Sequence, residues 1–292
     1  MKAVNLDVPA SSLGEGPLWD LEQQCLWWVD IDAGKVHQYD MVHKVHKEIH
    51  AGQLCSAVVL CRSGRLMVTV KDGFAYLDVV SGTVDGFVPV EELLSDNRFN
   101  DGKCDPAGRF WAGTMDYRKG LPQAGSLYVL EKDRSVTKKL ANITCSNGMA
   151  WSPDQNIFYY IDSPTYKVMA FDYDKATGAI GGGRTVVSIP ESQGMPDGMT
   201  IDTEGMLWIA LWGGAAVARY HPFSGACLSM IPLPVSNVTS CTFGGTDLTD
   251  LYITTAKAGP GKTDAAQQPL AGQVFVCKNS GARGIAPFKF MD

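Results

Sequence analysis

The sequence lacks the features that mark several large protein classes. No apolar run approaches the roughly 20 residues that span a membrane, and no block of lysine and arginine marks an arm that binds nucleic acid or an anionic membrane. The first residues, Met1–Asp7, have no apolar core of the kind found in secretory signals. Because the net charge of −6 is spread along 292 residues, we expect a cytoplasmic globular protein without a nucleic-acid or membrane partner.

Paired cysteines and clustered metal ligands are also missing. The eight cysteines include no C-x-x-C pair, and most lie in apolar, strand-like runs, which predicts buried free thiols without disulfides. Of the five histidines, four lie in one polar stretch that resembles an exposed strand edge: His37, His43, His46 and His50. We interpret this stretch as solvated, with a surface metal site as the alternative. No G-x-S-x-G elbow is present, so a serine hydrolase triad is not expected.

What the sequence does contain is an internal repeat. Its unit is a polar loop, a short apolar strand, a turn rich in Gly, Asp, Pro and Asn, and a second strand with large apolar side chains. One copy reads Gly16–Asp20 followed by Cys25–Asp30, and another reads Asp101–Gly108 followed by Arg109–Gly113. Further β-rich segments bounded by turn residues follow each copy, and no stretch has the period of a long amphipathic helix.

The spacing of this repeat predicts the fold. The large residue of the second strand recurs at intervals of 40 to 49 residues, at Trp27, Met67, Trp111, Tyr159, Trp208 and Tyr252. This is the period of a four-stranded propeller blade. Six units indicate an all-β chain whose residues 1–292 form a single six-bladed β-propeller domain with four-stranded antiparallel blades. We expect Val4–Val8 to pair with the last blade near Gln273–Val276, which would remove an open sheet edge.

The repeat also aligns a set of polar residues. The residues that precede the large residues by 11 or 12 positions are Glu15, Asn100, Asn147 and Asp197. In the two weaker copies they are Ser56 and Ser240. This position precedes the innermost strand, which faces the axis of a propeller, so these side chains are expected to converge. Most of them lie beside a glycine, and the alternative interpretation is that they cap turns.

Converging oxygen donors suit one divalent cation. Carboxylates and amides are ligands for Ca²⁺, Mg²⁺ or Mn²⁺, and carboxylates also accept Zn²⁺. Glu15, Asn147 and Asp197 would leave open positions for water and substrate, as a catalytic metal requires. Such an ion would polarise a carbonyl and activate water, while Asp197 or a free carboxylate such as Asp101 could accept the proton.

Four short motifs stand at these positions: Leu13–Pro17, Asn97–Lys103, Ser146–Gly148 and Pro196–Gly198. Together they resemble those of the SMP-30/gluconolactonase/luciferin-regenerating enzyme family, which includes animal regucalcins and bacterial sugar lactonases. The likeness extends from about Leu13 to the C-terminus, in register with all six repeats. It implies a six-bladed propeller in which Glu15, Asn147 and Asp197 bind a divalent metal.

The resemblance also implies roles for individual residues. Arg98 and Asn100 would contact the substrate, with Asn100 close to the metal, and Asp197 is the family's usual candidate for the catalytic base. Asp101 is included among the substrate-binding candidates. Without the resemblance, a surface salt bridge is the alternative interpretation of Arg98.

The chain departs from the family in one loop. Animal members carry a carboxylate after the segment equivalent to Gly113–Met115, and Arg118 stands at that place here. We therefore expect Arg118 to contact the substrate and to alter which sugar fits, with Asp116 as the residue that could replace the missing carboxylate.

The resemblance implies metal-dependent hydrolysis of a sugar (aldono) lactone, such as gluconolactone, to the aldonic acid. The expected partner is this small molecule, and the expected assembly is a monomer or a weak homodimer. Three alternatives stay open: a calcium-binding regulatory protein of the regucalcin type, a propeller used as an interaction platform, and another metal-dependent hydrolase of organophosphates or aryl esters.

Overall fold

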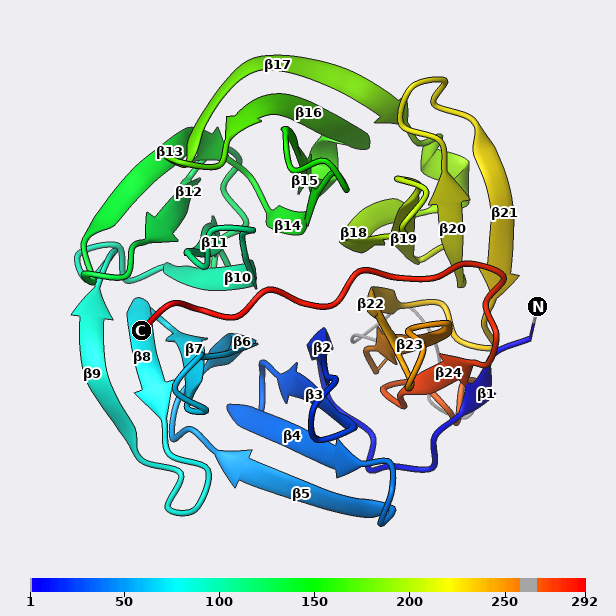
Figure 1. Ribbon diagram of the computed structural model, residues 1–292, viewed down its shortest axis with the longest axis horizontal. Helices are drawn as coiled ribbons and strands as arrows, with labels where there is room; N and C mark the ends of the chain where they lie inside the picture. The colour runs from blue at the N-terminus through cyan, green and yellow to red at the C-terminus, as the bar shows by residue number, and fades with distance from the viewer. Residues whose placement is uncertain (1, 258–266) are drawn as a thin grey trace.

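The computed structural model describes residues 2–257 and 267–292. These residues form six four-stranded antiparallel sheets arranged as blades around one axis, which confirms the predicted six-bladed β-propeller (Figure 1). Within these two ranges the helices are two single 3-10 turns, η1 (Ser163–Thr165) and η2 (Glu191–Gln193). No helix in the described residues is long and apolar enough to cross a membrane.

Each blade runs from an innermost strand at the axis to an outermost strand at the rim. Blade 1 holds β2 (Gly14–Asp20), β3 (Cys25–Asp30), β4 (Lys35–Asp40) and β5 (Val45–His50), and blade 2 holds β6 (Cys55–Leu60), β7 (Leu66–Val70), β8 (Gly73–Leu77) and β9 (Val84–Pro89). Blade 3 holds β10 (Asn97–Cys104), β11 (Phe110–Asp116), β12 (Gly125–Leu130) and β13 (Val136–Ile143), and blade 4 holds β14 (Ser146–Trp151), β15 (Ile157–Asp162), β16 (Lys167–Asp174) and β17 (Ala179–Ser188). Blade 5 holds β18 (Met195–Ile201), β19 (Leu207–Trp212), β20 (Ala216–Tyr220) and β21 (Cys227–Pro232), and blade 6 holds β22 (Val238–Gly244), β23 (Asp250–Thr255), β24 (Phe275–Cys277) and β1 (Val4–Asn5).

The polarity of the side chains on each strand depends on the distance of that strand from the axis. Second strands such as β3 and β19 are nearly continuous apolar runs, because neighbouring blades cover both of their faces. Outermost strands such as β5 and β17 face water and are mostly exposed. The large residues that reveal the repeat, from Trp27 to Tyr252, lie in the second strands and are all buried. The apolar core therefore lies between the blades, and the axis is left for polar residues.

Both terminal segments of the chain pair with the blades and help to close the propeller. Val4 pairs with Val276 and Asn5 with Phe275, so the predicted pairing of the N-terminal segment with the last blade is confirmed. A second closure was not predicted from the sequence. The C-terminal strap, residues 284–292, crosses one end of the central channel (Figure 1). Its backbone donates from Gly284 to the Leu248 carbonyl of blade 6 and from Phe290 to the Leu60 carbonyl of blade 2, each at 2.8 Å.

All six innermost strands carry a β-bulge at the same level. At the bulge, the innermost strand has one residue more than the second strand that pairs with it. On β2 this occurs between Glu15 and Leu18. The residue at this level is Glu15, Ser56, Asn100, Asn147, Asp197 or Thr239, and we call these six the bulge ring. The sequence count placed Ser240 in this set, which the pairing corrects to Thr239. The β22–β23 hairpin is longer than those of the other blades, so the count back from Tyr252 falls one residue short.

Two predictions about titratable residues have different outcomes. All eight cysteines are free, and six of them are buried, as expected. The histidine stretch lies on β4, on β5 and in the turn between them, and it leaves His43 and His50 exposed, but the assignment of His37 to an exposed edge is wrong. The His37 ring is buried and stacks on Trp28, with ring centroids 4.8 Å apart. Its alternation on β4 turns it inward, against the neighbouring strand.

Candidate functional site

The three predicted metal ligands belong to the bulge ring and come from three separate blades. Glu15 lies on β2, Asn147 on β14 and Asp197 on β18, and their side chains are 6%, 4% and 7% exposed. All three stand inside strands, so the alternative that they cap turns is wrong. A bulge adds one residue to a strand and re-aims its side chain, which is how a regular blade presents a polar group to the axis.

Two of the glycines that follow these ligands, Gly148 and Gly198, are required by crowding at the axis. A Cβ atom on Gly198 would collide with the Ser240 side chain of the next blade. One on Gly148 would lie 2.8 Å from the Asp197 carbonyl oxygen, closer than real Cβ contacts. In blades 4 and 5 the ligand–glycine pairs therefore reflect close approach of neighbouring innermost strands, whereas Gly16 is favoured by its positive φ of 53°.

A chain of hydrogen bonds connects Arg98 to the ligand Asn147. Arg98 Nη1 donates to Asn100 Oδ1 at 2.7 Å, and Asn100 Nδ2 donates to Asn147 Oδ1 at 3.0 Å. Asn147 Nδ2 in turn donates to Ser163 Oγ at 2.8 Å, and Ser163 donates to the Pro196 carbonyl, next to Asp197. These bonds fix the orientation of the Asn147 amide and leave one lone pair of its oxygen for a ligand.

The buried carboxylates of the bulge ring create an environment that favours a bound cation. Burial and the charge of Asp101 raise the pKa of Glu15 to about 8. Burial, followed by the charges of Glu15 and Asp101, raises the pKa of Asp197 well above its usual value. Arg98 offsets these effects only in part. Two buried carboxylates and an amide oxygen that lack a full counter-charge fit the preference of a hard divalent cation such as Ca²⁺.

Arg98 lies beside this site and is not a surface salt bridge. Its side chain is 7% exposed, and Nη1 also donates to the Phe99 carbonyl at 2.8 Å. Burial lowers its pKa from the ordinary value. The Tyr117 ring lies over the guanidinium, 5.9 Å from Cζ to the ring centroid. Arg98 and Tyr117 therefore form one wall at the end of the channel opposite the C-terminal strap.

The loop that departs from the family pattern lies next to this wall. The Arg118 side chain is exposed, and its Nε donates to the Tyr117 hydroxyl at 3.1 Å. The Asp116 carboxylate accepts backbone N–H groups of its own loop, including Lys119 at 2.7 Å. Asp116 thus shapes the loop, and Arg118 reaches the site region through Tyr117.

Asp101 occupies a different level from the three ligands. It follows Asn100 on β10, at the position where three other innermost strands carry Gly16, Gly148 and Gly198. Its carboxylate accepts the Gly102 N–H at 2.7 Å, and burial raises its pKa. The side chain lines the channel on the strap side of the bulge ring, away from Arg98.

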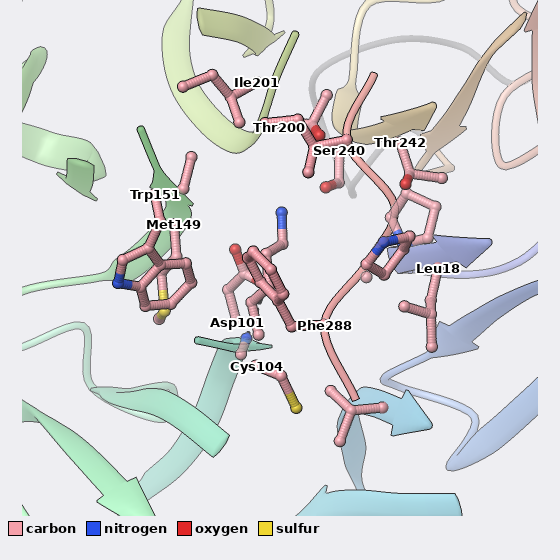
Figure 2. Close-up of a pocket in the computed structure, with 18 of the residues that line it drawn as sticks. Leu18, Asp101, Cys104, Met149, Trp151, Thr200, Ile201, Ser240, Thr242 and Phe288 are labelled. Carbon is pink, nitrogen blue, oxygen red and sulfur yellow. Dashed lines mark hydrogen bonds between the residues drawn. The ribbon is translucent and has the colours of Figure 1, made fainter. Parts of the chain in front are cut away.

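On that side the channel opens into a cavity, which we call the lower cavity (Figure 2). All six blades contribute to its wall, and the C-terminal strap covers it with Ile285–Phe288. Apolar side chains such as Leu18, Trp151 and Phe288 surround a few polar ones. Lys103 and Asp101 are the charged residues that line it.

Two contributors to the site were missed by sequence reasoning. Ser163, in η1, follows the second strand of blade 4 and belongs to no motif, yet it orients Asn147. Tyr117 was named only as part of the Arg118 loop, yet its ring covers Arg98. Neither has a repeat equivalent that a count along the chain could find, because both act through side chains that approach from a neighbouring loop.

The chain is similar to known proteins along most of its length. Residues 13–257 match the SMP-30/Gluconolactonase/LRE-like region. The chain is 40% identical over 297 residues to regucalcin of Gallus gallus, covering 99% of each chain. It is 39% identical over 277 residues to the putative sugar lactone lactonase YvrE of Bacillus subtilis, covering 94% of each.

Among solved structures, a calcium-binding protein, regucalcin, from Agrobacterium tumefaciens superimposes with a TM-score of 0.92 at 28% identity, covering 98% of this chain and 96% of that one. The matched region contains Glu15, Asn147 and Asp197 together with the Arg98–Asn100 pair. The chain belongs to the SMP-30/gluconolactonase/LRE-like family.

Proposed function

We propose that this protein hydrolyses a sugar lactone with the help of one divalent cation held by Glu15, Asn147 and Asp197. The observation that carries the proposal is the pair of buried carboxylates, Glu15 and Asp197, whose charges the protein itself neutralises only in part. The similarity to the Bacillus subtilis protein, a putative sugar lactone lactonase, supports the reaction class. The similarity to the calcium-binding protein from Agrobacterium tumefaciens supports a divalent cation.

In lactone hydrolysis, different residues of the chain would have different roles. When bound, the cation would polarise the lactone carbonyl and make water more acidic. Asp197 is the candidate base, the role that the family resemblance implies for it, and Asp101 is the alternative carboxylate. Arg98 presents its remaining N–H groups beside the bulge ring, where they can donate to sugar hydroxyls or to the carboxylate of the product.

Asn100 has a positioning role in this proposal. Both hydrogens of its amide are directed to protein acceptors, the Ser146 carbonyl at 2.8 Å and Asn147 Oδ1 at 3.0 Å. Its oxygen accepts from Arg98. Asn100 therefore couples the substrate-binding guanidinium to a metal ligand and keeps one lone pair for the substrate.

The test combines metal analysis with lactonase assays. After chelation, activity on five- and six-carbon aldonolactones should disappear and return with one divalent ion per chain. Glu15→Gln and Asp197→Asn should each reduce metal content and lower kcat/KM by more than the roughly 10- to 100-fold typical of residues that only orient ligands. Ser56→Ala, at the same level of the bulge ring, is the matched control and should retain both the metal content and the activity of wild type. Unchanged metal content and activity in both carboxylate variants would reject the proposal.

Calcium binding without catalysis is the second candidate function, favoured by the similarity to the calcium-binding protein from Agrobacterium tumefaciens. The same assays separate the two. Calcium binding that Glu15→Gln abolishes, with no lactone hydrolysed under any metal, would support the binding function alone.

A further inference from the structure

Lys103 extends into the channel between the metal site and the C-terminal strap. It follows the bulge residue Asn100 by three positions on β10 and pairs with Trp111 of β11. Its Nζ donates to the Met199 carbonyl of β18 at 2.7 Å. The side chain therefore reaches from blade 3 to blade 5, past blade 4, and holds a positive charge near the axis.

The groups around this ammonium are mainly oxygen atoms, with the buried Cys241 thiol also nearby. Besides the Met199 carbonyl, the lower cavity presents the Asp101 carboxylate and the hydroxyls of Thr200, Ser240 and Thr242. Within the described residues Nζ has no second hydrogen-bond acceptor and forms no ion pair with a carboxylate. Burial lowers the pKa of Lys103, while the Asp101 charge raises it. A carboxylate, a carbonyl and hydroxyls are the set of groups that binds a hard cation.

The charge of the channel explains why a cation is needed there. Asp101 adds a third carboxylate close to Glu15 and Asp197 and raises the pKa of both. Among the residues that line the lower cavity, Lys103 is the single cation. A fixed charge on a four-carbon stem cannot leave, whereas a metal ion in this place would exchange with solvent.

We propose that Lys103 is a tethered cation that takes the place of a second metal ion in the lower cavity and restricts the channel to one divalent ion. This inference rests on the proposed function, because that one ion is the ion held by Glu15, Asn147 and Asp197. Lys103 is a specificity-determining residue for metal stoichiometry and does not touch the substrate. Without its ammonium, Asp101, the Met199 carbonyl and the cavity hydroxyls form an oxygen site open to calcium.

The experiment counts ions in chelator-stripped protein dialysed against Ca²⁺ or Mn²⁺. Wild-type protein should bind one ion per chain, and Lys103→Met should bind one more than wild type. In chelator, Lys103→Met should melt at a lower temperature than wild type, and Ca²⁺ should raise its Tm more than that of wild type. The control is Asp101→Asn combined with Lys103→Met, which removes both charges and should lose the additional ion while keeping the first.

The outcomes separate this inference from the proposed function. No ion in wild type contradicts the proposed metal site, whereas the difference between Lys103→Met and wild type tests Lys103 alone. An equal ion count in these two proteins, with an equal gain in Tm from Ca²⁺, would overturn the inference. If Lys103→Met does not fold, Lys103→Gln, which keeps a donor for the Met199 carbonyl, should show the same additional ion.

Discussion

At the scale of single residues, the two arginines near the site differ in how the protein holds them. Arg98 is buried, and two of its hydrogen bonds run to the protein through one nitrogen, Nη1. Its remaining N–H groups are preorganised, because the bonded end cannot rotate. Arg118 is exposed and, among the described residues, contacts the site through the hydroxyl and ring of Tyr117. Preorganised donors lose little entropy when a substrate binds, and flexible ones lose more.

Arg98→Ala should therefore lower kcat/KM for the lactone by roughly 10- to 100-fold, the range expected from losing one charge-assisted hydrogen bond of about 1.5–3 kcal/mol. Metal content should stay at the wild-type value. Arg118→Glu, the matched variant in the neighbouring loop, should retain hydrolysis and change only the ranking of five- and six-carbon aldonolactones. Steady-state kinetics on a lactone panel measures both. Loss of all activity in Arg118→Glu would place that residue in the catalytic machinery instead.

The same residues show what a sequence can predict about a site. Glu15, Asn147 and Asp197 were found because each occupies one level of a repeat, and a repeat converts a position along the chain into a position at the axis. Ser163 has no such rule. Lys103 stands at a repeat level, as the partner of Trp111, but the count does not tell which blade its long side chain approaches. Their places depend on which neighbouring blade they approach, and the contact of Lys103 with Met199 joins residues 96 positions apart.

At the scale of strands and hairpins, the blade count was predictable because all six second strands keep one large buried residue. The level of each bulge was predictable only where hairpin length is constant. Five residues lie between the paired Ile201 and Leu207 in blade 5, and seven lie between Phe243 and Leu251 in blade 6. That difference displaced the predicted ring residue from Thr239 to Ser240. The two additional residues, Gly244 and Asp250, form one further strand pair next to the turn, so the length of the paired hairpin end is the weakest part of a count along the chain.

Strands β4 and β5 carry a pH-dependent element of stability. Burial, with a smaller contribution from the charge of His46, lowers the pKa of His37 from 6.5 to about 4. The folded protein thus holds His37 neutral, while an unfolded chain protonates it below about pH 6.5. The unfolded state binds more protons between these values, so stability is full above about pH 6.5 and is lost as the pH falls towards 4.

His37→Phe keeps the stack on Trp28 and removes this titration. At pH 7 the variant lacks the 3.0 Å hydrogen bond between the His37 and His46 rings and should be less stable by about 1 kcal/mol. Between pH 7 and pH 5 the difference in free energy of unfolding should shift by about 2 kcal/mol in favour of the variant. Urea unfolding at several pH values measures the difference, in which contributions from distant groups cancel. His43→Phe, an exposed position in the turn between β4 and β5, should show no such pH-dependent gain. A constant difference between His37→Phe and wild type from pH 7 to pH 5 would contradict the assignment.

At the scale of the whole molecule, the propeller is held by two closures on different sheets. The N-terminal strand β1 completes blade 6 through paired backbone hydrogen bonds, which protects that blade's edge. The C-terminal strap joins blade 6 to blades 2 and 3 across the channel, where Met291 N–H donates to the Gly108 carbonyl at 2.9 Å. Between Gly284 and Phe290 it spans the lower cavity, so it closes the channel and ties opposite sides of the ring together (Figure 1).

Phe290 is the anchor of this strap, and its removal is the sharpest test of the second closure. Its side chain is fully buried in a cluster with Cys61 of blade 2 and Phe110 of blade 3. Phe290→Ala should lower the free energy of unfolding by about 3–5 kcal/mol, measured by denaturant unfolding, because it leaves a cavity where two blades meet. Phe223→Ala is the control, since Phe223 is 80% exposed and its loss should change stability by about 0.5 kcal/mol or less. Metal content of the folded Phe290→Ala protein should match wild type, because Glu15, Asn147 and Asp197 are held by the blades and not by the strap. Equal stabilities for the two alanine variants would mean that the strap covers the channel without holding the ring closed.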